Sequence, residues 1–215
     1  MQNNRTMNSK STTYTALAFA GYLALAVAFF FIRGWFVAVP TLFAAVMAAV
    51  NCRKGGNAIP LALLFSAAGD YAGSTGDFIM QVGFFAVAHI CYICDFAPHR
   101  VAQRPRMIGA TVLATITTLY LGFVLSHIVE QAEFLAVAVY ALIIYIMGAT
   151  AIFQRRQHYG WYVAAALLFI LSDSLIVFGK YIAPIPNGNA WVMVTYYAAQ
   201  GLFMTLHLLR RPSAE

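Results

Sequence analysis

Long apolar runs, broken by short polar segments, follow one another along nearly the whole chain. Eight of these runs have the length, about 17–25 residues, with which a helix crosses a bilayer. Because lipid offers no hydrogen-bond partner to backbone groups, each run is expected to be helical. The pattern therefore predicts an all-α membrane protein, a bundle of eight transmembrane helices. The predicted spans are residues 12–32, 35–51, 57–73, 78–97, 106–127, 132–153, 159–180 and 190–209.

The composition leaves little room for anything outside the membrane. Of the 215 residues, 62% are apolar and 9% are charged, and the mean hydropathy is +0.75. About a quarter of an ordinary soluble domain is charged. We expect a cytoplasmic tail at residues 1–11, a single membrane domain at 12–209 and a second cytoplasmic tail at 210–215. The first apolar run follows basic residues as a signal peptide does, but it is too long for a cleaved one and should be retained.

The net charge of +6 reflects topology and does not indicate a nucleic-acid partner. With eight spans, the termini and the even-numbered connections share one side, which carries eleven lysines and arginines, while the other side has only Arg33 and Lys180. Cytoplasmic loops are enriched in basic residues, so both termini should be cytoplasmic, as in a multi-pass protein of the bacterial inner membrane. The eleven residues are Arg5, Lys10, Arg53, Lys54, Arg100, Arg104, Arg106, Arg155, Arg156, Arg210 and Arg211.

Two aspartates interrupt apolar runs within similar phrases. Ala-Leu-Leu-Phe-Ser-Ala-Ala-Gly-Asp ends at Asp70, and Ala-Leu-Leu-Phe-Ile-Leu-Ser-Asp ends at Asp173. Each lies roughly 20 Å from the start of its span at 1.5 Å per residue, so both should lie in the outer half of the membrane and could share one cavity. An ionisable group at this depth is costly and usually functional. The phrases also predict a parallel repeat of spans 3–4 and 7–8.

Further polar residues recur at helical spacing on four spans, which indicates a polar bundle interior. Serines and tyrosines often form hydrogen bonds between membrane helices, so for them this structural role is as good an explanation as function. His89 has the same alternative. Asp95 is expected to be solvated or paired with Arg100, and Asp77 to cap the fourth span. The stripes comprise Ser66, Asp70, Ser74 and Asp77; His89, Tyr92 and Asp95; Ser172, Asp173 and Ser174; and Tyr196, Tyr197, Gln200 and His207.

Neither a metal site nor a disulfide framework is indicated. The three cysteines are an odd number, and the pair Cys91 and Cys94 is best interpreted as small apolar residues. The five histidines never stand four residues apart, the spacing that places two imidazoles on one helix face.

Four ordered motifs resemble the YhhN, or lysoplasmalogenase-like, family over about half the chain. They are Leu-Leu-Phe-Ser-x-x-Gly-Asp70, Gly83-Phe-Phe-x-x-x-His89-x-x-Tyr92, Leu-Phe-x-x-Ser172-Asp173-Ser174-Leu175 and Thr195-Tyr196-Tyr197-x-x-Gln200. The family usually carries a Lys-Pro pair near the second span. Here only Arg33 and Pro40 are nearby, seven residues apart, so a headgroup-binding role of that lysine is lost or passes to Arg33.

The resemblance implies hydrolysis of the vinyl ether bond of a lysophospholipid, a lysoplasmalogen, to a fatty aldehyde and a glycerophospho-base, with no cofactor. Protonation of the vinyl carbon would leave an oxocarbenium ion to which water adds. Asp70 and Asp173 are the predicted catalytic pair, one the acid and the other the base, because two carboxyls buried near each other can divide these roles. The predicted substrate-binding residues are His89, Tyr92, Ser172, Tyr196, Tyr197 and Gln200.

Other functions fit the residues as well. A proton-coupled transporter or lipid carrier could use the buried aspartates, since repeats and membrane carboxylates suit ion coupling. A non-catalytic lipid-binding protein would keep its activity in cells when both aspartates are replaced. A hydrolase could also act on a different lysolipid. The sequence leaves open whether the chain forms a homo-oligomer.

Overall fold

The computed structural model describes residues 2–50 and 56–210, with side chains from residue 12 onward. This part of the chain forms α-helices, two short 3-10 helices and one isolated bridge between Arg100 and Gln154. The helices follow the predicted spans closely. They are α1 (Gln2–Ile32), η1 (Gly34–Val37), α2 (Ala38–Val50), α4 (Ala58–Ser74), α5 (Phe78–Phe96), η2 (Ala97–His99), α6 (Arg104–Leu125), α7 (Gln131–Phe153), α8 (Tyr159–Tyr181) and α9 (Gly188–Leu208).

Several helices are long and apolar enough to cross a membrane, as a multi-pass membrane protein requires. Five meet this description, and Gly34–Val50 is a shorter apolar segment. The span count of eight thus stays a prediction. The five are Thr12–Ile32, Phe78–His99, Arg104–Leu125, Gln131–Phe153 and Tyr159–Tyr181.

Pro40 lies at the start of a helix and not in its middle. The chain passes from α1 through Arg33 and Gly34, both with positive φ, into η1, and α2 begins at Ala38. A proline in the first turn removes no intrahelical hydrogen bond, because the first amides of a helix have no partner within it. From its place inside the predicted second span, Pro40 is expected to kink that span. This expectation is wrong, because the break comes before the proline.

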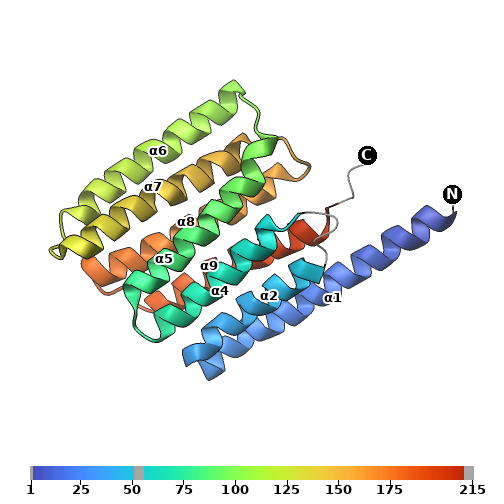
Figure 1. Cartoon of the computed structure of the whole chain (residues 1–215), viewed down its shortest axis with the longest axis horizontal. Coiled ribbons are helices and arrows are strands. Elements are labelled where there is room, and N and C mark those ends of the chain that lie inside the picture. Colours follow the sequence, from blue (N-terminus) through green and yellow to red (C-terminus); the bar gives the residue numbers. More distant parts are fainter. Residues whose placement is uncertain (1, 51–55, 211–215) are drawn as a thin grey trace.

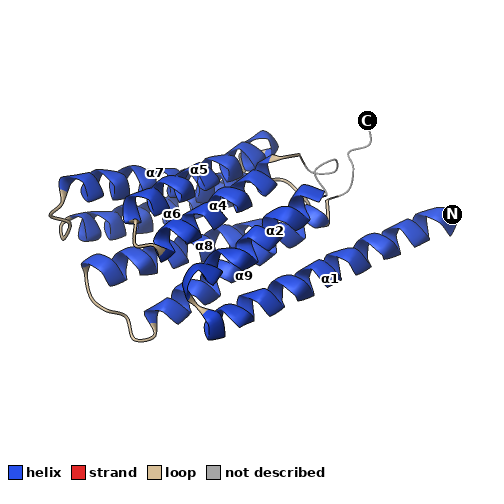
Figure 2. Cartoon of the chain, turned by 60° about the horizontal axis from the view of Figure 1, so that its bottom comes forward, coloured by secondary structure: helices blue, strands red, loops and turns tan. Residues whose placement is uncertain are grey.

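The helices form one bundle in which α6 and α7 lie on one flank and α1 and α2 on the other (Figure 1). Between them, α4 packs on α5, and α8 packs on α9. The connections after α1, α4, α6 and α8 gather at one end, which we call the turn end, and both termini point to the other (Figures 1 and 2).

Asp95 is buried near the end of the bundle that holds the termini, where it pairs with two arginines. Its Oδ2 lies 2.5 Å from the guanidinium nitrogens of both Arg156 and Arg210. Arg210 also donates to the hydroxyl of Tyr162, at 3.2 Å. The expectation that Asp95 is solvated or paired with Arg100 is wrong, because the segments before α8 and after α9 fold back over the end of α5. Asp77 caps α5 as expected, accepting a hydrogen bond from the Met80 amide at 2.9 Å.

Candidate active site

Asp70 is buried on α4, where hydroxyl groups from two other helices approach it. The hydroxyl of Tyr196 on α9 donates to Asp70 Oδ2 at 2.8 Å, and Thr41 on α2 donates to the Tyr196 oxygen at 3.4 Å. The preceding Gly69 makes room for Phe85 of α5: a Cβ at Gly69 would lie 2.9 Å from that ring. The Gly-Asp pair therefore lets an aromatic ring pack closely against the turn of helix that carries the carboxyl.

Asp173 is buried on α8 and has a different set of partners. The hydroxyl of Tyr140 on α7 donates to Asp173 Oδ2 at 2.5 Å. The Nε2 atom of His89 on α5 lies 2.8 Å from the Tyr140 oxygen and 3.5 Å from Asp173 Oδ2. Among the described residues, the other carboxyl oxygen of Asp173 and Nδ1 of His89 have no hydrogen-bond partner. A titratable imidazole thus contacts this carboxyl, and one of its oxygens remains available.

Both carboxyls line one cavity of about 320 Å³, which we call the polar cavity. The expectation that they share a cavity is confirmed. The cavity lies toward the turn end, since its wall includes Gly34, Gly73 and Asn189 beside the interhelical connections. Its polar wall consists of Arg33, Asp70, Ser74, Gln81, Ser172, Asp173, Asn189 and Tyr196.

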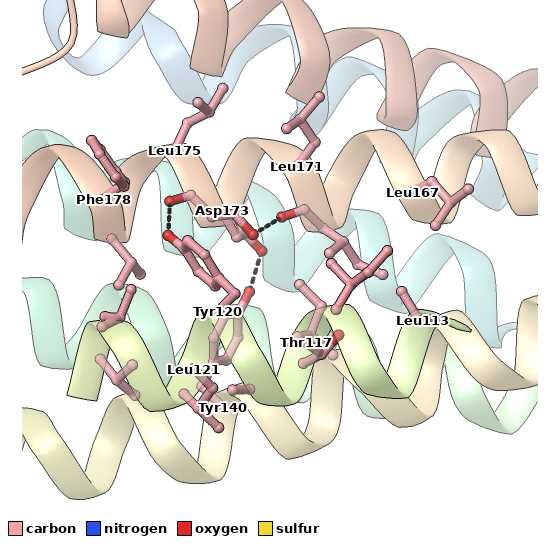
Figure 3. A pocket seen from close by; sticks show the side chains of 18 of the residues that line it. Leu113, Thr117, Tyr120, Leu121, Tyr140, Leu167, Leu171, Asp173, Leu175 and Phe178 are labelled. Atoms are coloured by element: carbon pink, nitrogen blue, oxygen red, sulfur yellow. Dashed lines mark hydrogen bonds between the residues drawn. The ribbon is translucent and has the colours of Figure 1, made fainter. Parts of the chain in front are cut away.

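A second cavity of about 650 Å³, the apolar groove, lies between α6, α7 and α8 (Figure 3). Asp173 also lines this groove, between Leu167 at one end and Phe178 at the other (Figure 3). Tyr140 lines it too, and Tyr120 closes on the same stretch of α8, where its hydroxyl donates to the backbone oxygen of Ser174 at 2.6 Å. The carboxyl of Asp173 therefore borders both cavities, whereas Asp70 borders only the polar one.

The other predicted substrate-binding residues are all buried, but their contacts are cross-helix hydrogen bonds. Ser172 donates to the backbone oxygen of Val192 at 3.1 Å, and Tyr197 donates to that of Val37 at 2.8 Å. Tyr92 donates to Gln200 Oε1 at 2.7 Å. Of these four, Ser172 alone lines the polar cavity or the groove. Substrate contact by Tyr92, Tyr197 and Gln200 stays a prediction.

Sequence reasoning missed several residues of the site. Tyr140 is the most important, because it contacts both Asp173 and His89, yet it lies in an apolar run of α7 whose other tyrosine is Tyr145. Thr41, Gln81 and Asn189 were missed as well. A signal for Tyr140 existed in principle, since a tyrosine hydroxyl deep in a membrane span needs a hydrogen-bond partner.

The described side chains of the site are better suited to acid–base chemistry than to holding a metal ion. No group of three or more His, Cys, Asp or Glu side chains in this part of the chain is placed to hold a metal ion. Two carboxyls and one imidazole instead face hydroxyl groups, and these are groups that accept, donate or relay protons.

Comparison with known proteins places the chain in a family. The model of the YhhN family matches residues 33–206, a region that contains both carboxyls and all the lining residues of the polar cavity except Phe29. The chain belongs to the YhhN family. No solved structure matches this YhhN protein.

Three relatives illustrate how far the similarity reaches. The YhhN protein is 36% identical over 135 residues to the human protein lysoplasmalogenase TMEM86B. This matched region covers 63% of the YhhN protein and 55% of the relative. It is 35% identical to the rat protein of the same name, over 64% of this chain and 55% of the relative. It is 28% identical to a lysoplasmalogenase of Mycobacterium tuberculosis, over 67% of this chain and 57% of the relative. The chain thus spans little more than half the length of the relatives it matches.

Proposed function

We propose that this YhhN protein is a membrane hydrolase that cleaves the vinyl ether bond of lysoplasmalogens. The observation that carries the proposal is the position of Asp173, whose carboxyl faces the polar cavity on one side and the apolar groove on the other. A lysoplasmalogen has the same division, a polar glycerophospho-base joined to a hydrocarbon chain through the vinyl ether. The relatives named lysoplasmalogenases, human and mycobacterial, support the same reaction.

The reaction adds one water and yields two products. A proton goes to the vinyl carbon one bond removed from the ether-bearing carbon, and the double-bond electrons form the new C–H bond. The resulting oxocarbenium ion takes up water, which loses a proton to become a hemiacetal. The hemiacetal carbon–oxygen bond then breaks, the glycerol oxygen regains a proton, and the fatty aldehyde leaves.

We assign different roles to the two carboxyls from their different positions. The carbon that receives the proton belongs to the hydrocarbon chain, so its donor should border the apolar groove, as Asp173 does. Asp70 borders only the polar cavity, where its negative charge would stabilise the oxocarbenium ion and draw a proton from the attacking water. Tyr140 and His89 lie where they would orient Asp173 and return its proton.

Arg33 is proposed to hold the phosphate of the headgroup. Its side chain is exposed and lines the polar cavity at the turn end, where a headgroup would lie at the membrane surface. A guanidinium matches phosphate in both charge and geometry. This position supports the transfer of the headgroup role from the missing Lys-Pro pair to Arg33.

The proposed setting is the bacterial inner membrane, with eight spans, a parallel repeat and both termini cytoplasmic. The described arginines Arg100, Arg104, Arg106, Arg155 and Arg156 follow α5 or α7 or begin α6, away from the turn end, which supports this orientation. The polar cavity would then open toward the outer face. Of the other basic residues counted for this side, Arg5, Lys10, Arg53, Lys54 and Arg211 lie outside the described side chains.

The first experiment is product analysis on purified protein. The protein is incubated in detergent with lysoplasmenylethanolamine, lysophosphatidylethanolamine and the saturated ether analogue, and mass spectrometry identifies aldehyde or fatty acid. Aldehyde from the vinyl ether alone is expected, and Asp173→Asn should abolish it. Asp77→Asn, which alters an exposed helix cap, is the matched control and should retain activity. Fatty acid from the ester lipid would redirect the assignment to another lysolipid, and absence of product from all three would refute the hydrolase.

A further inference from the structure

The apolar groove runs along α8 from Leu167 to Phe178, eleven residues or about 16 Å at 1.5 Å per residue. Aliphatic side chains of α6, α7 and α8 form its walls. The polar residues of the wall are Thr117, Tyr120, Tyr140, Asp173 and Ser174. Tyr120, Tyr140 and Asp173 lie near one another, and Thr117 lies between them and Leu113 (Figure 3). The groove is thus mainly apolar, and the carboxyl already proposed for catalysis lines its middle.

Packing explains why the groove stays open between three helices. The helix α6 packs extensively on α7 but makes little contact with α8. The helix α7 therefore forms the floor of the groove, and α6 and α8 form its two walls. At the end away from the turn end, Gly148 of α7 lets those walls meet. A Cβ at Gly148 would lie 2.7 Å from Ile170 of α8 and 2.8 Å from Leu113 of α6. The groove therefore narrows where Leu113 and Ile170 approach each other.

We propose that the apolar groove binds the hydrocarbon chain of the lysolipid, with the first chain carbons at Asp173 and the chain running toward Leu113. This inference rests on the proposed function, because it takes the bond beside Asp173 to be the one that reacts. The polar cavity holds the head at the turn end, so the chain extends in the opposite direction, toward the membrane interior. The part of α8 between Asp173 and Leu167 covers about 9 Å, so a long chain extends beyond the groove into lipid.

The residue that the two cavities share, Asp173, singles out this occupant. A surface that only contacts bulk lipid does not need a carboxyl. Asp173, which is 5% exposed, nevertheless lines the groove about midway along its length. A molecule that fills both cavities must place its head-to-chain junction at that carboxyl. In a lysoplasmalogen this junction is the vinyl ether.

Photolabelling tests where the chain lies without requiring turnover. The probe is a saturated ether lysophosphatidylethanolamine with a diazirine in the first part of its chain, within the about 9 Å that the groove covers, added to the purified full-length protein in detergent. Competable labelling is expected on peptides of α6 and α8 around Leu113, Ile116 and Leu167. Labelling confined to α1, α2 or α9, or unaffected by excess unlabelled lipid, would overturn the proposal.

Two neighbouring substitutions on α7 test the same idea by activity. Ala141 lines the groove, whereas Leu142 is 59% exposed and lies outside it. Ala141→Phe places a ring in the groove and should lower kcat/KM about tenfold or more for a long-chain substrate, with a smaller loss for a short chain. Leu142→Phe should stay close to the wild type. Equal activity of Ala141→Phe and Leu142→Phe at every chain length would refute chain binding here.

The outcomes separate this inference from the proposed function. Groove labelling by a protein that forms no aldehyde would support the chain site and refute the reaction. Aldehyde formation with labelling elsewhere would support the reaction and refute the chain site. Thermal unfolding shows whether each variant folds. If Ala141→Phe does not fold, the labelling pattern of the wild type alone tests where the chain binds.

Discussion

The two buried carboxyls of the polar cavity have similar sequence surroundings but different neighbours. Asp70 receives a hydrogen bond from Tyr196, whose oxygen accepts one from the hydroxyl of Thr41. Asp173 receives one from Tyr140, which is joined to the imidazole of His89. Only Asp173 borders the apolar groove. A repeated phrase thus supplies two carboxyls, and α5 places an imidazole, that of His89, beside Asp173.

A third buried aspartate, Asp95, differs from these two because neighbouring arginines compensate its charge. Asp95 contacts the guanidinium groups of Arg156 and Arg210. Neither carboxyl of the polar cavity has such a direct arginine partner among the ion pairs within the described residues. A buried carboxyl without a cation is costly and is retained where it acts. The contrast separates the proposed catalytic pair from a structural ion pair.

The largest effect is expected for Asp173→Asn. The amide has nearly the same shape but cannot donate a proton as an acid, so aldehyde formation should fall by about 10³-fold or more. Single-turnover kinetics with lysoplasmenylethanolamine measure the chemical step directly. A residual rate within tenfold of the wild type would remove Asp173 from the role of acid.

Asp70→Asn should cost less, about 10²-fold, because it removes charge stabilisation and water activation but leaves the acid in place. The ratio of the two losses tests the division of roles. If Asp70→Asn proves more damaging than Asp173→Asn, the assignments must be exchanged. The saturated ether analogue should bind both variants about as well as the wild type, since neither carboxyl is assigned to the headgroup.

Tyr140→Phe should lower kcat by roughly 20-fold with little change in KM. The substitution removes a hydrogen bond to a carboxyl but keeps the ring in the wall of the groove. Tyr196→Phe is the matched control on the Asp70 side, where the hydroxyl has no link to an imidazole. Equal effects of the two substitutions would mean that the His89 relay contributes nothing.

The sequence predicted the helices well because an apolar run of membrane length has few alternatives to a helix. It also found both carboxyls of the cavity, since an aspartate in such a run stands out. It failed for Tyr140 and for the partners of Asp95, because these depend on which helices become neighbours. Nothing in the run around Tyr140 shows that α7 packs against α5 and α8.

Arg33→Ala should raise KM about fivefold and leave kcat nearly unchanged. The side chain is exposed, so its contact with a phosphate is screened by water and worth less than a buried pair. Arg33→Lys should restore part of the affinity because it keeps the charge. The measurement is the initial rate over a range of substrate concentrations, and a loss confined to kcat would contradict the headgroup role.

Asp95→Asn should have the smallest effect on the chemistry and a clear effect on stability. The site lies at the opposite end of the bundle from the polar cavity, so the activity of the folded protein should stay within about twofold of the wild type. The substitution leaves the partly buried guanidinium groups of Arg156 and Arg210 without their counter-ion, and breaking a buried pair costs about 3 kcal/mol or more, so a somewhat smaller loss is expected here. Thermal unfolding in detergent should show a lower Tm. A variant that keeps its Tm but loses aldehyde formation would show that Asp95 belongs to the reaction and that burial beside arginines does not mark a structural carboxyl here.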